Sequence, residues 1–105
     1  MSIDNRNAGF IVFNADVSRD SVAEIMHELT SVFYYHQWID VHMRDAGGRT
    51  AISYIVELKS SHEEVHTRFH HSIVGWLKVK LGTDDRDRPK GIDQWSMSNV
   101  LEVAA

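Results

Sequence analysis

Three histidines recur every four residues in the stretch that we expect to form the second helix of this 105-residue chain: His62, His66 and His70. Side chains four residues apart lie on one face of a helix, and paired histidines at that spacing can hold zinc or another divalent metal ion. A complete site would need a further ligand from elsewhere. The reading that we prefer is structural, with the rings packed along the margin of the apolar stripe and their nitrogens in water.

Asp40, His42 and Ser53 form a second group with chemical potential, because the expected strand pairing places an acid, a histidine and a hydroxyl on one surface. This combination resembles the set used in nucleophilic hydrolysis. A flat sheet, however, supplies neither an oxyanion pocket nor shelter from water. We interpret these residues as a polar cross-strand group, and we predict no catalytic residue and no cofactor.

The strands that carry this group form a predicted hairpin. Residues 38–44 and 51–59 alternate in polarity, and Gly47 and Gly48 between them are suited to a two-residue turn. The resulting register gives an apolar face with the pairs Met43–Ile52, Val41–Tyr54 and Ile39–Val56. The opposite face carries the pairs Arg44–Ala51, His42–Ser53, Asp40–Ile55 and Trp38–Glu57. A slip by one residue would destroy this separation, which supports the register.

The flanking segments supply the remaining elements. After an arm over residues 1–8 that we expect to be flexible, a short apolar run predicts a strand over 9–15, buried on both faces. Apolar residues at helical spacing predict a helix over 19–35 with Ser18 as its N-cap.

The second half of the chain begins with a capping-box pattern, in which Ser61 is the predicted N-cap and Glu64 the reciprocal partner. The helix that follows should end near Gly82. A charged loop over 83–91 leads to a last predicted strand over 92–103, in which the face of Trp95 stays open.

The order βαββαβ predicts an α+β domain over residues 9–105 with the ferredoxin-like plan: two helices packed on one face of a four-stranded antiparallel sheet. No helix is left to cover the other face. We therefore predict an interface there, formed by Trp38, Asp40, His42, Ser53, Ile55 and Glu57.

The composition limits the classes of function. The chain has no cysteine, which excludes disulfides, thiolate metal sites and thiol catalysis. A net charge of −4 disfavours general binding to nucleic acid. No apolar run reaches the roughly 20 residues of a membrane span, and the first residues lack an apolar signal core. These features predict a soluble, cytoplasmic protein with no membrane partner.

Together these features predict a small regulatory protein without catalytic activity that binds other proteins and forms a homodimer through its open sheet face. One alternative is a divalent metal or small-ligand protein, with or without enzymatic activity, that uses His62, His66 and His70. Another is a small acidic inhibitor of a larger complex.

Overall fold

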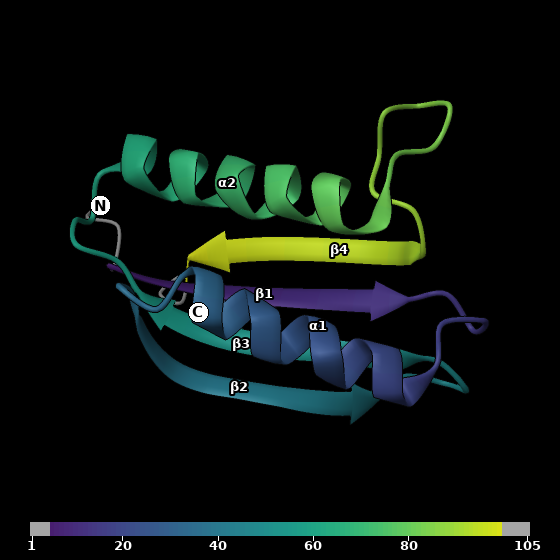
Figure 1. Ribbon diagram of the computed structural model, residues 1–105. Helices are drawn as coiled ribbons and strands as arrows, with labels where there is room; N and C mark the ends of the chain where they lie inside the picture. The colour runs from purple at the N-terminus through teal and green to yellow at the C-terminus, as the bar shows by residue number, and fades with distance from the viewer. Residues whose placement is uncertain (1–4, 100–105) are drawn as a thin grey trace.

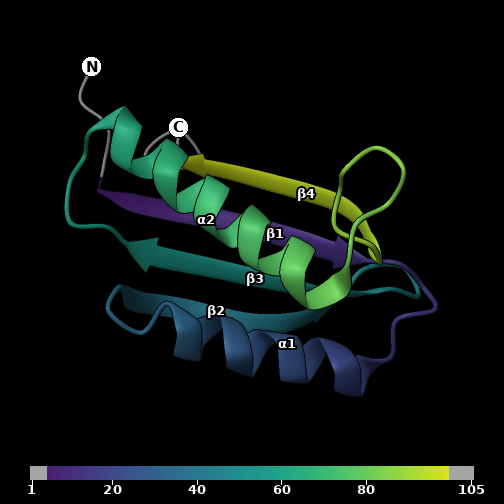
Figure 2. The ribbon, with the colours of Figure 1, turned by 45° about the horizontal axis from the view of Figure 1, so that its top comes forward.

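The computed structural model describes residues 5–99 (Figure 1). Its elements follow the predicted order: β1 (Arg6–Phe13), α1 (Arg19–Val32), β2 (Gln37–Asp45), β3 (Thr50–Glu57), α2 (Glu63–Leu81) and β4 (Ile92–Asn99). The four strands are all paired antiparallel in the order β2-β3-β1-β4. Both helices lie on the same side of this sheet (Figure 2). The predicted ferredoxin-like α+β fold is confirmed.

The hydrophobic core fills the space between the sheet and the two helices. Its fully buried members come from the two central strands, β1 and β3, and from both helices. They include Ile11, Phe13, Val22, Leu29, Ile52, Tyr54, Val56, Ile73 and Leu77. Each large aliphatic or aromatic side chain removed from water in this way stabilises the fold by roughly 1.5–3 kcal/mol. The core therefore holds the helices to one face and leaves the other face of the sheet without a helix.

Strand β1 begins at Arg6, three residues before the predicted start at residue 9. Residues 6–8, which were expected in a flexible arm, pair with β3, and Asn7 and Ala8 also pair with β4. The strand also ends earlier, at Phe13. Burial on both faces holds only in part, since Phe10 is 38% exposed on the face away from the helices. The predicted arm residues 1–4 lie outside the described part of the chain.

Helix α1 has the predicted N-cap, because the Ser18 hydroxyl oxygen accepts a hydrogen bond from the backbone N–H of Ser21 at 3.1 Å. The helix ends at Val32 and not at Tyr35. Phe33 turns into the core, where its ring lies 5.9 Å from that of Phe69. If the helix continued, the Phe33 carbonyl would accept a hydrogen bond within it. Here this carbonyl accepts from Trp38 Nε1 at 3.0 Å instead.

The hairpin between β2 and β3 has the predicted turn. Ala46 and Arg49 exchange backbone hydrogen bonds of 2.9 and 3.3 Å. Gly47 and Gly48 both have positive φ, 61° and 83°, as a primed two-residue turn requires. The predicted register is confirmed from the turn to the Asp40–Ile55 pair.

Helix α2 does not use the predicted capping box. Its N-cap is His62, with no capping hydrogen bond from the side chain, and the helix begins one residue later than expected. The Ser60 hydroxyl accepts from the backbone N–H of His62 at 3.1 Å, which draws the chain into a turn before the helix. At the other end Gly82 caps the helix, and its N–H donates to the Lys78 carbonyl at 2.8 Å.

Strand β4 covers Ile92–Asn99, and the remainder of the last predicted strand lies outside the described residues. Trp95 opposes Ile11 and so belongs to the helix-covered face, which the sequence left undecided. Neither α1 nor α2 is long and apolar enough to span a membrane.

Candidate functional site

The open face of the sheet, on the side away from both helices, carries five of the six residues predicted for an interface. Asp40 and His42 on β2 pair with Ile55 and Ser53 on β3, and Glu57 follows on the same face two residues after Ile55. Because successive side chains of a strand alternate between faces, these pairs fix the side on which each residue lies. The structure thus brings these five residues together on one surface.

Trp38 is the exception, and its predicted place on the open face is wrong. An irregularity in the β2–β3 ladder leaves Ile39 without a partner, so Trp38 opposes Val56 and Gln37 opposes Glu57. The predicted pairs Ile39–Val56 and Trp38–Glu57 are therefore absent. One extra residue in a strand reverses the faces of all residues beyond it.

The indole of Trp38 explains why the ladder shifts here. Its ring lies 5.6 Å from that of Tyr54 and 6.3 Å from that of Phe69, inside the aromatic part of the core. Its N–H is satisfied by the Phe33 carbonyl. Ile39 takes the surplus position instead and stays 48% exposed. Packing the Trp38 indole into the core with its N–H hydrogen-bonded removes more apolar surface from water than burying Ile39 would.

Strand β1 supplies the centre of the open face, which the sequence analysis did not assign to it. Ala8, Phe10 and Val12 alternate with the core residues of the strand and lie beside Ile55, Ser53 and Ala51 of β3. They follow one another along the middle of the sheet. The sequence does not predict this assignment, because a continuous apolar run does not reveal which of its residues face a helix.

Charged side chains flank this apolar centre. Asp40 forms an ion pair with His42. Arg44 Nε donates to the Ser53 hydroxyl at 3.1 Å, and Arg49 forms an ion pair with Asp93. Ser53 is therefore engaged by Arg44 and His42 by Asp40, so the three candidate residues for hydrolysis do not form a nucleophile–base pair.

The three histidines of the candidate metal site have different surroundings. His62 is exposed at the N-cap of α2. His66 is buried, and its Nδ1 accepts from Asn7 Nδ2 at 3.2 Å. Within residues 5–99, no three His, Asp or Glu side chains gather in an arrangement that could hold a metal ion. The three histidines of the alternative metal interpretation therefore do not form such a group.

His70 lies one turn beyond His66, half-buried against β4. Its ring is 5.2 Å from that of Trp95, and its Nδ1 lies 2.9 Å from Met97 Sδ. Burial, together with the neighbouring His71, lowers the pKa of the His70 imidazole. A lowered pKa keeps the ring neutral, as its apolar surroundings require.

Several polar atoms beneath α2 are buried without a hydrogen-bond partner. They are Asn7 Oδ1, Tyr54 Oη, His66 Nε2 and Trp95 Nε1. Burial raises the pKa of the Tyr54 phenol, and the Trp95 side chain beside it offsets part of this rise, so the phenol stays protonated. The phenol ring lies against Gly9, where any larger residue would collide with it. These side chains come from β1, β3, β4 and α2, and they meet where α2 packs on the sheet.

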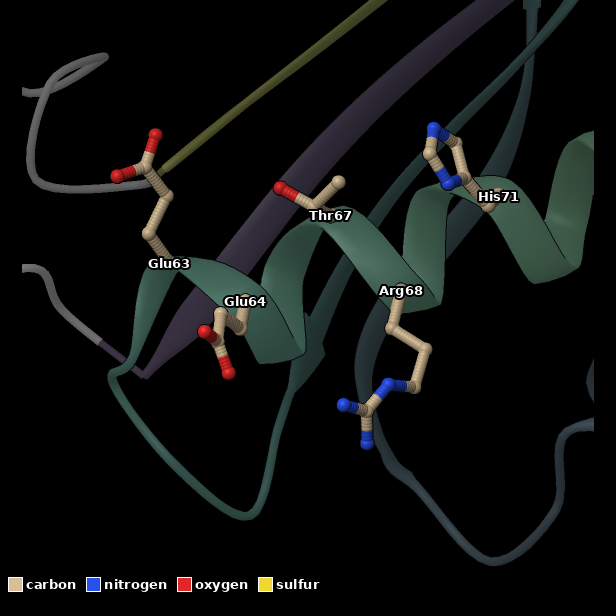
Figure 3. Close-up of a pocket in the computed structure, with 5 residues that line it drawn as sticks. All are labelled: Glu63, Glu64, Thr67, Arg68 and His71. Carbon is tan, nitrogen blue, oxygen red and sulfur yellow. The ribbon is translucent and has the colours of Figure 1, made fainter.

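A shallow hollow runs along the outward side of α2, lined by Glu63, Glu64, Thr67, Arg68 and His71 (Figure 3). All five residues are exposed, and all come from one helix. Figure 3 shows their side chains pointing away from the helix axis without converging on a common point. We therefore interpret this hollow as the solvated face of α2.

Comparison with known protein families, curated proteins and solved structures finds no match to this chain.

Proposed function

We propose that this protein is a small, non-catalytic binding protein that acts as a homodimer paired through its open sheet face. The observation that carries the proposal is the apolar centre formed by Ala8, Phe10 and Ile55, on a face that no element among the described residues covers. An apolar centre inside a polar rim is the usual anatomy of a protein interface.

The distribution of charge favours a second copy of this chain as the partner. Phe10, Ser53 and His42 lie in one row across the middle of the sheet. Toward one end of the strands lie the acidic residues Asp40 and Glu57, with Arg6 beside Glu57. Toward the other end lie Arg44 and Arg49, with Asp93 paired to Arg49.

A two-fold axis along the central row makes this face complementary to itself. The axis places the acidic end of one copy, with Asp40 and Glu57, over the basic end of the other, with Arg44 and Arg49. It also places Phe10 of one copy over Phe10 of the other. Homodimers are most often built on such a two-fold axis. Opposite charges at the rim orient the two faces, while the apolar centre supplies the free energy of association.

The test replaces Ile55 by glutamate. This side chain points away from the core, so the change puts a charge into the apolar centre of the open face. We expect the wild-type chain to be a dimer by sedimentation velocity, and Ile55→Glu to raise the dissociation constant at least about tenfold, equivalent to about 1.4 kcal/mol. The reason is that association would then have to take a carboxylate out of water into the apolar centre of the face, which is costly. Far-UV circular dichroism should show an unchanged fold.

The matched control is Val79→Glu, because Val79 on α2 is also an apolar residue but is 88% exposed and lies on the helical side. It should leave the dimer intact. A wild-type chain that is monomeric at all accessible concentrations would refute the proposal, as would an Ile55→Glu dimer of unchanged affinity.

A further inference from the structure

A hollow of about 300 Å³ opens on the helical side of the molecule, away from the open sheet face. Three segments form it: the turn after α1, Lys59 two residues beyond the end of β3, and the first half of α2. These segments meet at the end of the molecule on the left of Figure 1. Its lining consists of Tyr35, His36, Lys59, Val65, Arg68, Phe69 and Ser72.

Aromatic rings form one wall and the floor of this hollow, which we name the Tyr35 hollow. The rings of Tyr35 and His36 lie 4.4 Å apart. His36 in turn contacts the buried Phe69 edge to face, with ring centres 4.8 Å apart. Tyr35 itself is 57% exposed, so much of its side chain is accessible to a ligand. A planar ligand would stack on this wall without any rearrangement of the core.

Two positively charged side chains, Lys59 and Arg68, line the Tyr35 hollow. Unlike Arg19, Arg49 and Lys78, which form ion pairs with aspartates, Lys59 and Arg68 have no ion pair and no side-chain hydrogen bond within residues 5–99. Glu64, one helical turn before Arg68, does not form an ion pair with it. In a chain with a net charge of −4, two unpaired cations beside one hollow are a local site for an anion.

His36 adds an unsatisfied polar atom to the lining. Its Nδ1 is buried and has no hydrogen-bond partner. Such atoms are rare in folded proteins because leaving them unpaired is costly, so each one calls for a specific explanation. Burial and the nearby Lys59 charge lower the pKa of the imidazole, which is therefore neutral at pH 7.

We propose that the Tyr35 hollow binds a small aromatic carboxylate. Its ring would stack against Tyr35 above Phe69, and its carboxylate would lie between Lys59 and Arg68. A guanidinium matches a carboxylate in a bidentate geometry, and the added lysine favours a full negative charge over a neutral amide. The volume lies at the lower end of the range for ligand sites, which limits the ligand to about one ring.

The first experiment titrates the full, isotope-labelled chain with benzoate and follows backbone amide shifts by NMR. We expect saturable shifts confined to residues around the hollow, with a dissociation constant on the order of 1 mM for so small a probe. Benzamide, which lacks the charge, and cyclohexanecarboxylate, which lacks the flat ring, should each bind at least about fivefold more weakly. Equal binding of all three, or of inorganic phosphate as tightly as benzoate, would refute the proposed class.

Variants then locate the site. Arg68→Gln and Lys59→Gln should each weaken benzoate binding at least about fivefold, since both residues are exposed and their loss leaves the core unchanged. Lys90→Gln, in the loop after α2, removes an exposed cation elsewhere and should leave binding unchanged. Unchanged affinity in Arg68→Gln would overturn the assignment.

The imidazole of His36 gives a readout that does not depend on backbone shifts. A bound carboxylate beside it favours the protonated ring, so saturating benzoate should raise the pKa of His36 measured by NMR titration of the ring protons. An unchanged pKa under saturation would place the ligand elsewhere. The proposal is independent of the dimer, and Ile55→Glu should bind benzoate as the wild-type chain does.

Discussion

At the scale of single residues, the pair Asn7–His66 shows how a polar contact is kept inside an apolar core. Both side chains are buried, with 4% and 8% exposure. The amide Nδ2 of Asn7 can only donate, so Nδ1 of His66 accepts and the neutral ring carries its proton on Nε2. That proton and the Asn7 carbonyl oxygen have no partner. The pair is thus half satisfied, which limits what it adds to stability.

This arrangement predicts strong coupling between the two residues. Asn7→Leu alone should destabilise the fold by about 1–3 kcal/mol, because it leaves His66 buried without its one hydrogen bond. The double variant Asn7→Leu, His66→Leu should cost much less than the sum of the two single changes, since no polar group then remains unpaired. Urea denaturation of the four proteins measures the difference. Additive effects would show that the hydrogen bond contributes nothing specific.

At the scale of elements, two glycines in regular structure have opposite reasons for being there. Gly9 on β1 lies directly beneath the phenol of Tyr54 on β3, and a methyl group at Gly9 would lie 2.1 Å from Tyr54 Cζ. Tyr54 is only 1% exposed, so its ring is surrounded by other core residues. Gly75 on α2 has no atom within 4 Å of the same position.

Alanine scanning at these two positions should therefore give opposite signs. Gly9→Ala should lower the stability by about 1–3 kcal/mol through overpacking of the core. Gly75→Ala should raise it by about 0.5–1 kcal/mol, because alanine restricts the unfolded chain and favours the helix. Thermal unfolding followed at 222 nm checks both. A Gly9→Ala protein as stable as the wild type would mean that β1 and β3 do not hold this close contact.

At the scale of the whole molecule, the half-buried histidines His36 and His70 connect stability to pH. Burial lowers the pKa of His36 and of His70 below 6.5, so the folded chain binds fewer protons than the unfolded chain as the pH falls through that value. Stability is therefore complete above about pH 6.5 and is lost as the pH drops from there toward the lowered folded values.

The expected result is a Tm a few degrees lower at pH 5.5 than at pH 7.5. Replacing both His36 and His70 by glutamine should make the Tm depend less on pH in this window. His27→Gln, which removes an exposed histidine from α1, controls for the loss of a histidine from the surface. A double variant with the full wild-type dependence would assign the effect to other groups.

The sequence by itself determined the features that depend on neighbours along the chain. The element order, the Ser18 cap and the Gly47–Gly48 turn follow from local periodicity and turn chemistry, and the turn then sets the pairing as far as Asp40 and Ile55. For this reason five of the predicted interface residues share one face. Each of these features is decided within a few residues, where patterns of polarity are informative.

Tertiary structure alone decided the rest, because the deciding contacts join residues far apart in the sequence. Trp38 moved to the core since Tyr54, Phe69 and the Phe33 carbonyl together surround its indole. His66, which the metal interpretation grouped with His62 and His70, instead forms a hydrogen bond with Asn7, 59 positions away. The Tyr35 hollow likewise exists only where three separate segments meet. Periodicity reports which side of an element is apolar, whereas packing determines which partner that side meets.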